Sequence, residues 1–125
     1  MMFDTDVLIW VFRGSEKAAR LVESAAERRL SIVSYMELLQ GARDRHEAQA
    51  IKRFLVDGGF QMLPLTENIG HRAAIYMEEH SLRSGLALAD ALLAATAVEN
   101  GLTLCTGNQK HYKPVRELAL RVFRP

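Results

Sequence analysis

The chain has 125 residues, of which 49% are hydrophobic and 25% are charged, with a formal net charge of +1 at pH 7. This length suits one domain with a substantial core, and the composition is that of an ordinary globular protein. The net charge neither demands nor excludes a nucleic-acid partner, because phosphate-binding surfaces are often local patches on balanced chains. We therefore predict a single domain over residues 1–125.

The N-terminal third alternates short apolar runs with helical patterns. Residues 1–3 predict a very short first strand ending at Asp4, and the apolar character continues through residues 7–12. Ser15 predicts the N-cap of a helix in which apolar residues recur at helical spacing. Residues 30–33 predict the second strand.

Helices dominate the middle of the chain. Residues 35–43 predict one helix, and a second amphipathic pattern ends near the glycines at 58–59. Residues 60–63 predict a third and weaker strand, and residues 69–80 predict a further amphipathic helix.

The C-terminal third contains one of the most apolar segments of the chain. Residues 89–100 are apolar nearly all round, which predicts a buried helix with Gly101 as its stop signal. Residues 102–105 predict a strand, and residues 119–123 predict a last, edge strand. Short strands alternating with helices are typical of an α/β domain with a mostly parallel sheet, here of four to five strands.

The cysteine content and the apolar segments bear on the compartment. Cys105 is the only cysteine, so no intrachain disulfide can form, and its apolar surroundings predict a buried, inert thiol. The first residues lack the pattern of a signal peptide, and no apolar run approaches the ~20 residues of a membrane span. We expect a cytoplasmic protein with no membrane segment.

Three acidic residues lie close to the ends of predicted strands or on connections. Asp4 follows the first strand, Glu37 comes shortly after the second, and Asp90 lies near the start of the buried helix. Ligands of open parallel sheets bind outside the carboxyl ends of the strands, so these side chains and residues 106–108 can share one edge. Carboxylates without cysteine or histidine partners indicate a hard divalent cation, Mg²⁺ or Mn²⁺. The sequence therefore predicts a metal-dependent site that cleaves phosphodiesters.

Asp4, Asp6 and Asp90 also have structural interpretations. Asp4 could be the N-cap of the following helical segment, although Asp6 fits that role better, and Asp6 could equally be a supporting partner or a solvated residue. Asp90 interrupts a very apolar stretch, where a lone carboxylate is unusual unless it is paired. The alternatives for Asp90 are a buried N-cap or a salt bridge, for example with Arg83, and we favour a metal ligand over both.

Ser34 and Glu37 have the spacing of a Ser-x-x-Glu capping box, in which each side chain satisfies a backbone N–H at a helix start. Taken with the other motifs, Glu37 is better interpreted as a metal ligand, with Ser34 in a capping or supporting role. The cluster at residues 106–108 could be a simple turn after a strand.

In that cluster, Asn108 could offer its amide oxygen to a cation or hold a water bound to it, with Thr106 in a supporting role. Lys110 and Lys113 follow in what we predict to be a solvated basic loop, with contact to RNA phosphates as a second role. The four histidines show no paired ligand spacing, so we do not expect a zinc site.

These motifs resemble the PIN-domain family, and more narrowly the VapC-type toxins of bacterial toxin–antitoxin pairs. The resemblance runs over nearly the whole chain and is carried by Phe3-Asp-Thr-Asp-Val-Leu-Ile, Glu37-Leu-Leu-Gln-Gly, Asp90-Ala-Leu-Leu-Ala-Ala-Thr-Ala and Leu104-Cys-Thr-Gly-Asn-Gln-Lys-His-Tyr. It implies a PIN-like α/β/α sandwich and a Mg²⁺- or Mn²⁺-dependent ribonuclease that leaves a 5′-phosphate and a 3′-hydroxyl.

By position, Asp4, Glu37 and Asp90 match the family's characteristic acidic ligands, and Asn108 stands at the fourth catalytic position. Many relatives carry Asp where this chain has Asn108 or His111, so we expect one tightly held cation rather than two. The resemblance also implies a VapB-type antitoxin, a structured RNA substrate of the tRNA or rRNA class, and a homodimer.

Two other classes of function remain open from the sequence. A haloacid-dehalogenase-like phosphatase would use Asp4 as nucleophile and Asp6 as general acid, but the chain is short for that family and lacks a convincing downstream acidic pair. A PIN-like module that binds RNA or protein without cutting is favoured by Asn108 and His111 in place of acids.

Overall fold

Each strand except the last is followed by a helix, as expected of parallel strands joined by crossover connections. The computed structural model describes residues 1–125. Its elements, in chain order, are β1 (Met2–Phe3), α1 (Thr5–Phe12), α2 (Glu16–Ser24), β2 (Arg29–Ser31), α3 (Ile32–Gln40), α4 (Arg45–Asp57), β3 (Gln61–Leu63), α5 (Glu67–Ser84), α6 (Leu88–Glu99), β4 (Leu104–Thr106), α7 (Gln109–Tyr112) and β5 (Leu120–Val122).

The five strands form one sheet in the order β3-β2-β1-β4-β5, and every neighbouring pair is parallel. The chain builds outward from β1 through β2 to β3, and then crosses to the other side of β1 to add β4 and β5. The strand order therefore reverses between β1 and β4, the point at which open α/β sheets bind their ligands. The predicted edge strand is confirmed as β5.

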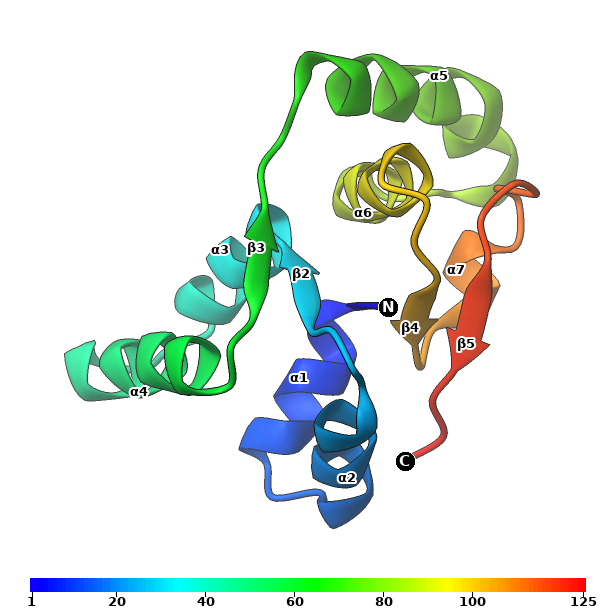
Figure 1. Cartoon of the computed structure of the whole chain (residues 1–125). Helices are drawn as coiled ribbons and strands as arrows, with labels where there is room; N and C mark the ends of the chain where they lie inside the picture. The colour runs from blue at the N-terminus through cyan, green and yellow to red at the C-terminus, as the bar shows by residue number, and fades with distance from the viewer.

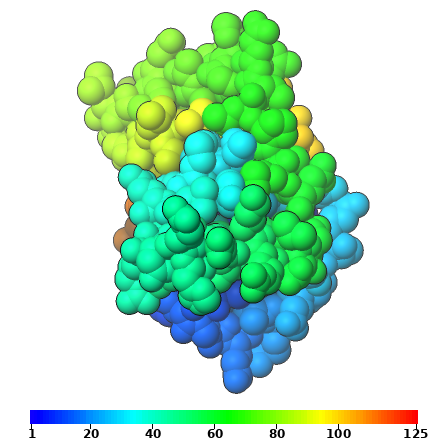
Figure 2. Space-filling model, turned by 90° about the vertical axis from the view of Figure 1, so that its left-hand side faces the viewer, coloured from blue at the N-terminus to red at the C-terminus, as the bar shows by residue number.

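Helices cover both faces of the sheet, which confirms the α/β/α sandwich. α5 and α6 lie on one side and α1 and α2 on the other (Figure 1). Successive strand residues point to opposite faces. Met2 and Leu104 belong to the core beneath α5 and α6, whereas Phe3 and Cys105 belong to the core beneath α1, α2 and α4. Figure 2 shows the side of the molecule on which α4 lies, between α1 and α2 below and α5 above.

The Cys105 side chain is fully buried, as predicted, and burial raises the pKa of its thiol to about 11. The buried helix is also confirmed. α6 ends at Glu99, and Gly101 follows with a φ of +64°, the left-handed conformation for which glycine is the usual residue. No helix combines the length and the apolar character that crossing a membrane requires.

The start of α3 differs from the prediction. The helix begins at Ile32 rather than near Tyr35, and its N-cap is Ser31, whose hydroxyl accepts a hydrogen bond from the Val33 N–H at 3.0 Å. The alternative interpretation of Ser34 and Glu37 as a capping box is therefore not realised, because Ser34 already lies inside the helix. β2 ends at Ser31 with no intervening loop, so Ile32 and Val33, whose branched side chains suggested a strand, form the first helical turn.

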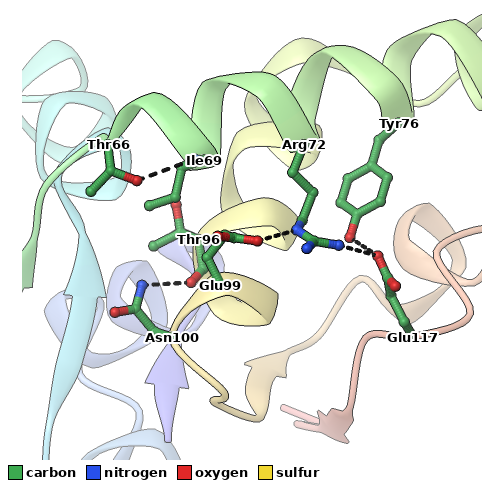
Figure 3. Close-up of polar contacts among 8 residues, drawn as sticks. All are labelled: Thr66, Ile69, Arg72, Tyr76, Thr96, Glu99, Asn100 and Glu117. Carbon is green, nitrogen blue, oxygen red and sulfur yellow. Dashed lines mark hydrogen bonds and ion pairs between the residues drawn. The ribbon is translucent and has the colours of Figure 1, made fainter.

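A polar network on α5 fixes the segment that follows α7. Figure 3 shows the Arg72 guanidinium between Glu99 of α6 and Glu117, with the Tyr76 hydroxyl donating to the same Glu117 carboxylate. Burial, reinforced by the Glu117 contact, raises the pKa of Tyr76 to about 12, and the Tyr76 hydrogen bond lowers the pKa of Glu117. This network attaches Glu117, in the connection between α7 and β5, to α5 and α6.

Candidate active site

Asp4 lies at the junction between β1 and α1, at the carboxyl edge of the central strand. It is the N-cap of α1, and its Oδ1 accepts a hydrogen bond from the Thr5 N–H at 2.7 Å. The expectation that Asp6 suits the N-cap better is wrong, because α1 starts directly after the strand and leaves Asp6 within its first turn. Capping leaves the second Asp4 oxygen, Oδ2, for other partners.

Two hydroxyls hold that second oxygen. Asp4 Oδ2 accepts hydrogen bonds from Thr106 Oγ1 at 2.8 Å and from the Tyr112 hydroxyl at 2.9 Å. Asp4 is only 5% exposed, and burial raises the pKa of its carboxyl to about 6, with a further increase from the nearby Asp6 charge. The hydrogen bonds from Thr106, Tyr112 and Thr5 lower this pKa but do not cancel the effect of burial.

Asp90 reaches the same place from α6. Its Oδ1 lies 3.2 Å from the Tyr112 hydroxyl. Asp4 and Asp90, which are far apart in the sequence, therefore contact the same tyrosine. Its Oδ2 lies 3.3 Å from His111 Nδ1, and the Asp90 side chain is 20% exposed. The N-cap alternative for Asp90 is not realised, since the N-cap of α6 is Ala87, and the ion-pair contact of Asp90 is with His111 rather than with Arg83.

Glu37 is joined to the site through Thr5. The Thr5 hydroxyl lies 2.7 Å from Glu37 Oε1 and 2.8 Å from Ser34 Oγ. Thr5 has a single hydroxyl proton and an ionised carboxylate only accepts, so Thr5 donates to Glu37 and is left to accept from Ser34. Ser34 therefore supports the site rather than capping the helix, and Glu37 keeps its second oxygen, Oε2, free of protein hydrogen bonds.

Asp6 lies beside these groups with one satisfied and one unsatisfied oxygen. Its Oδ2 accepts a hydrogen bond from the Gly107 N–H at 2.9 Å, whereas its buried Oδ1 has no hydrogen-bond partner. Burial is the main cause of the raised pKa of Asp6, and the charge of Asp90 raises it further. A buried carboxylate oxygen without a partner is rare in proteins and indicates a group whose natural partner is a cation or water.

The segment after β4 contributes less than its sequence suggested. Thr106 is fully buried and supports Asp4 as described, and its hydroxyl also accepts from the Asn108 N–H at 2.9 Å. The Asn108 side chain is exposed and forms no hydrogen bond with the carboxylates, so its role as a ligand stays a prediction. The predicted basic loop is the short helix α7, which places Lys110 in an open cleft of ≈ 420 Å³ and Lys113 outside its lining.

Sequence reasoning missed Tyr112 and Thr5. Tyr112 follows two basic side chains in a segment that was interpreted as a solvated loop, yet it is fully buried and touches both aspartates. The sequence offered little sign of this burial beyond an aromatic residue one helical turn after Gln109, where α7 begins. Thr5 gave no signal of its own beyond its place between Asp4 and Asp6.

The donor chemistry fits a hard divalent cation. Asp4, Asp6, Glu37 and Asp90 offer oxygen only, and one buried oxygen of Asp6 has no hydrogen-bond partner in the protein. No three Asp, Glu, His or Cys side chains converge into a closed cation cage. Such an open arrangement suits Mg²⁺, which is usually bound through one or two carboxylates and completes its shell with water and substrate phosphate.

The fold and the site define a class of protein: an α/β/α domain with carboxylates from the first strand and a late buried helix gathered at the switch point of a parallel sheet. Residues 1–117 match the family model of the PIN domain. The chain belongs to the PIN-domain family, and 34% identity over most of its length to a protein named ribonuclease VapC10 places it among the VapC-type proteins.

Relatives of known name agree with this assignment. The chain is 34% identical over 122 residues to ribonuclease VapC10 of Mycobacterium tuberculosis, which covers 94% of this chain and 90% of that protein. It is 28% identical to a chain of a toxin–antitoxin complex from Klebsiella pneumoniae, with a TM-score of 0.77 and 94% of both chains covered. The fold also matches VapBC2 of Rickettsia felis bound to a promoter DNA fragment, with a TM-score of 0.82, 17% identity and 98% of both chains covered.

Replacement of Gly107 by alanine tests the contact between the loop after β4 and Asp6. A Cβ at this position would lie 2.7 Å from Asp6 Oδ2. We expect Gly107→Ala to lower the free energy of unfolding by about 1 kcal/mol, because the Asp6 carboxylate must move aside and lose its hydrogen bond from the Gly107 N–H. Gly70→Ala in α5 is the matched control, since its Cβ meets nothing within 4 Å, and it should stabilise by about 0.5–1 kcal/mol. Urea unfolding measures both, and a Gly107→Ala protein as stable as wild type would contradict the contact.

The raised pKa of Asp4 predicts how stability depends on pH. The folded protein holds this proton up to about pH 6, whereas the unfolded chain releases it near pH ~3.9. Raising the pH from 4 to above 6 therefore removes stability, by about 2–3 kcal/mol for a shift of this size. Asp4→Asn carries no charge and should be more stable than wild type at pH 8 but not at pH 4, in the absence of divalent cations.

Chemical denaturation at several pH values measures this difference, with the exposed Glu78→Gln as control. An Asp4→Asn protein that keeps the wild-type dependence on pH would show that Asp4 is not the group whose burial costs stability.

Proposed function

We propose that this protein is a metal-dependent, site-specific endoribonuclease and the toxin of a toxin–antitoxin pair. The observation that carries the proposal is the meeting of Asp4 and Asp90, from segments far apart in the sequence, on one Tyr112 hydroxyl at the switch point of the sheet. Support comes also from the relative named ribonuclease VapC10, at 34% identity over 94% of the chain.

Asp4 and Asp90 would hold the cation, Mg²⁺ or Mn²⁺. Glu37 lies at the same edge of the sheet. When bound there, the cation supplies charge that orients the scissile phosphate and lowers the pKa of the attacking water. Because Asn108 and His111 stand where many relatives carry a further carboxylate, we expect one cation rather than two. Thr106 and Thr5 hold Asp4 in position, and this lowers the cost of ordering the site when substrate binds.

Glu37 is suited to receive the proton of the attacking water. The Thr5 hydroxyl donates to Glu37 Oε1 and so orients the carboxylate, whereas Oε2 has no hydrogen-bond donor from the protein and can accept a proton. In-line attack of the water on the phosphate then breaks the bond to the 3′-oxygen and gives a 5′-phosphate and a 3′-hydroxyl, the products that the family resemblance implies. The leaving 3′-oxygen takes up a proton from solvent.

Basic side chains beside the site would position the RNA backbone. The open cleft next to the carboxylates is lined in part by Lys110, His111 and Arg124. Cationic side chains at such a position contact phosphates without reading sequence, so the choice between tRNA and rRNA must come from the shape of the RNA. Lys113 lies outside this lining and is a weaker candidate for phosphate contact.

The antitoxin would be a small VapB-type protein. A groove of ≈ 640 Å³ runs beside Glu37 between α1, α3 and α4, with Ile9, Phe12 and Leu38 on its apolar side. An apolar groove next to a charged site suits a partner segment that covers the carboxylates when it binds. The similarity to a chain of a toxin–antitoxin complex supports this partner, whereas a homodimer stays a prediction.

The haloacid-dehalogenase-like alternative loses its support. The PIN match over residues 1–117 points away from that family, and its proposed nucleophile, Asp4, serves as the N-cap of α1.

Cleavage of total cellular RNA by purified, antitoxin-free protein tests the proposal. We expect discrete fragments with Mg²⁺ or Mn²⁺ and none with EDTA. Asp90→Asn should cut more than about 100-fold more slowly while staying folded, since removal of even the outer partners of a metal site typically costs 10–100-fold. Glu78→Gln, an exposed carboxylate away from the site, is the matched control and should cut at the wild-type rate.

Two outcomes would contradict the proposal in different ways. Unchanged cleavage by Asp90→Asn would remove Asp90 from the site. RNA binding without cleavage by folded protein under any metal would favour the PIN-like binding module, with Asn108 and His111 as the first residues to replace by aspartate.

A further inference from the structure

The Tyr112 hydroxyl occupies the space between the two carboxylates that are the proposed cation ligands. It lies 2.9 Å from Asp4 Oδ2 and 3.2 Å from Asp90 Oδ1, and the residue is fully buried. Burial and the two neighbouring carboxylates raise its pKa, so the phenol stays protonated and acts as a donor. A phenol has one proton, and therefore the two carboxylates share a single hydrogen bond at any moment.

The ring of Tyr112 is fixed by its place in the fold. It closes the short helix α7, whose backbone is attached to the site through the bond from the Asn108 N–H to Thr106 Oγ1. On the other side, Tyr112 belongs to the core that includes Val115 and Leu118. The ring is thus held by packing, whereas only its terminal oxygen faces the carboxylates.

A cation bound by Asp4 and Asp90 needs the same oxygen lone pairs that accept from this hydroxyl. A donor proton and a cation cannot use one lone pair together, so they compete. We propose that Tyr112 is a positioning residue whose O–H proton takes the place of the cation between Asp4 and Asp90 when the site is empty, and turns away from the carboxylates when a cation binds. This inference rests on the proposed metal-dependent function, and it concerns how the empty site is kept stable.

The competition fixes the sign of the effect of Tyr112→Phe, which removes the hydroxyl and keeps the ring. In EDTA at pH 8, the two carboxylates lose their shared donor, and the thermal midpoint should fall by several degrees. The cation no longer displaces a hydrogen bond to a charged group, so Mn²⁺ should bind about tenfold more tightly. A tyrosine that arranges the carboxylates for the cation would instead give weaker binding in the variant.

Calorimetric titration with Mn²⁺ is the test, in wild type, Tyr112→Phe and Tyr76→Phe. Tyr76 is the matched control, because it is also a buried tyrosine whose hydroxyl donates to a carboxylate, Glu117, but it lies away from the site. Tyr76→Phe should lower stability and leave the Mn²⁺ affinity unchanged. Affinity that is unchanged or weaker in Tyr112→Phe would overturn the role of Tyr112.

The titration also separates this inference from the proposed function. If wild type binds Mn²⁺ and cleaves RNA but Tyr112→Phe binds with wild-type affinity, only the role of Tyr112 fails. If wild type binds no Mn²⁺ and does not cleave, both fail.

A second measurement covers the case in which Tyr112→Phe does not fold. A tyrosine that loses a carboxylate acceptor absorbs at shorter wavelength, so Mg²⁺ should give a blue-shifted near-ultraviolet difference spectrum in wild type and in Tyr76→Phe. No shift at saturating Mg²⁺ would overturn the proposal.

Discussion

Burial of like charge at one edge of the sheet is the constraint on which the site depends. Asp4, Asp6 and Asp90 approach each other where β1, β4 and α6 meet, and no lysine or arginine is paired with any of them. Burial and mutual repulsion raise the pKa of Asp4 to about 6. Buried carboxylates that destabilise the protein without a ligand are stabilised when a positively charged ligand binds beside them.

The same residues also build the fold, which links stability to function. Asp4 caps α1 with one oxygen and faces the site with the other, so the N-terminal strand and helix are ordered by a candidate catalytic residue. Thr106 and Tyr112 satisfy that second oxygen from β4 and α7. The polar network of Arg72, shown in Figure 3, attaches Glu117 to α5 and α6 and contacts none of these site residues.

Much of this arrangement could be predicted from the sequence, because strand–helix alternation and carboxylates near strand ends carry the information. The five parallel strands, the buried α6 and the approach of Asp4 to Asp90 follow from those patterns. The start of α3 could not be predicted, since Ile32 and Val33 favour a strand by side-chain type and are placed in a helix by the cap at Ser31. Tyr112 could not be predicted as a site residue, because only the tertiary packing of α7 turns its side chain inward.

Crystals soaked with Mn²⁺ and measured for anomalous scattering would locate the cation, provided the same preparation cleaves RNA. We expect one anomalous peak within direct coordination distance of both Asp4 and Asp90. An active preparation whose only peak lies elsewhere, or which shows none at saturating Mn²⁺, would contradict the assignment of this edge as the catalytic metal site.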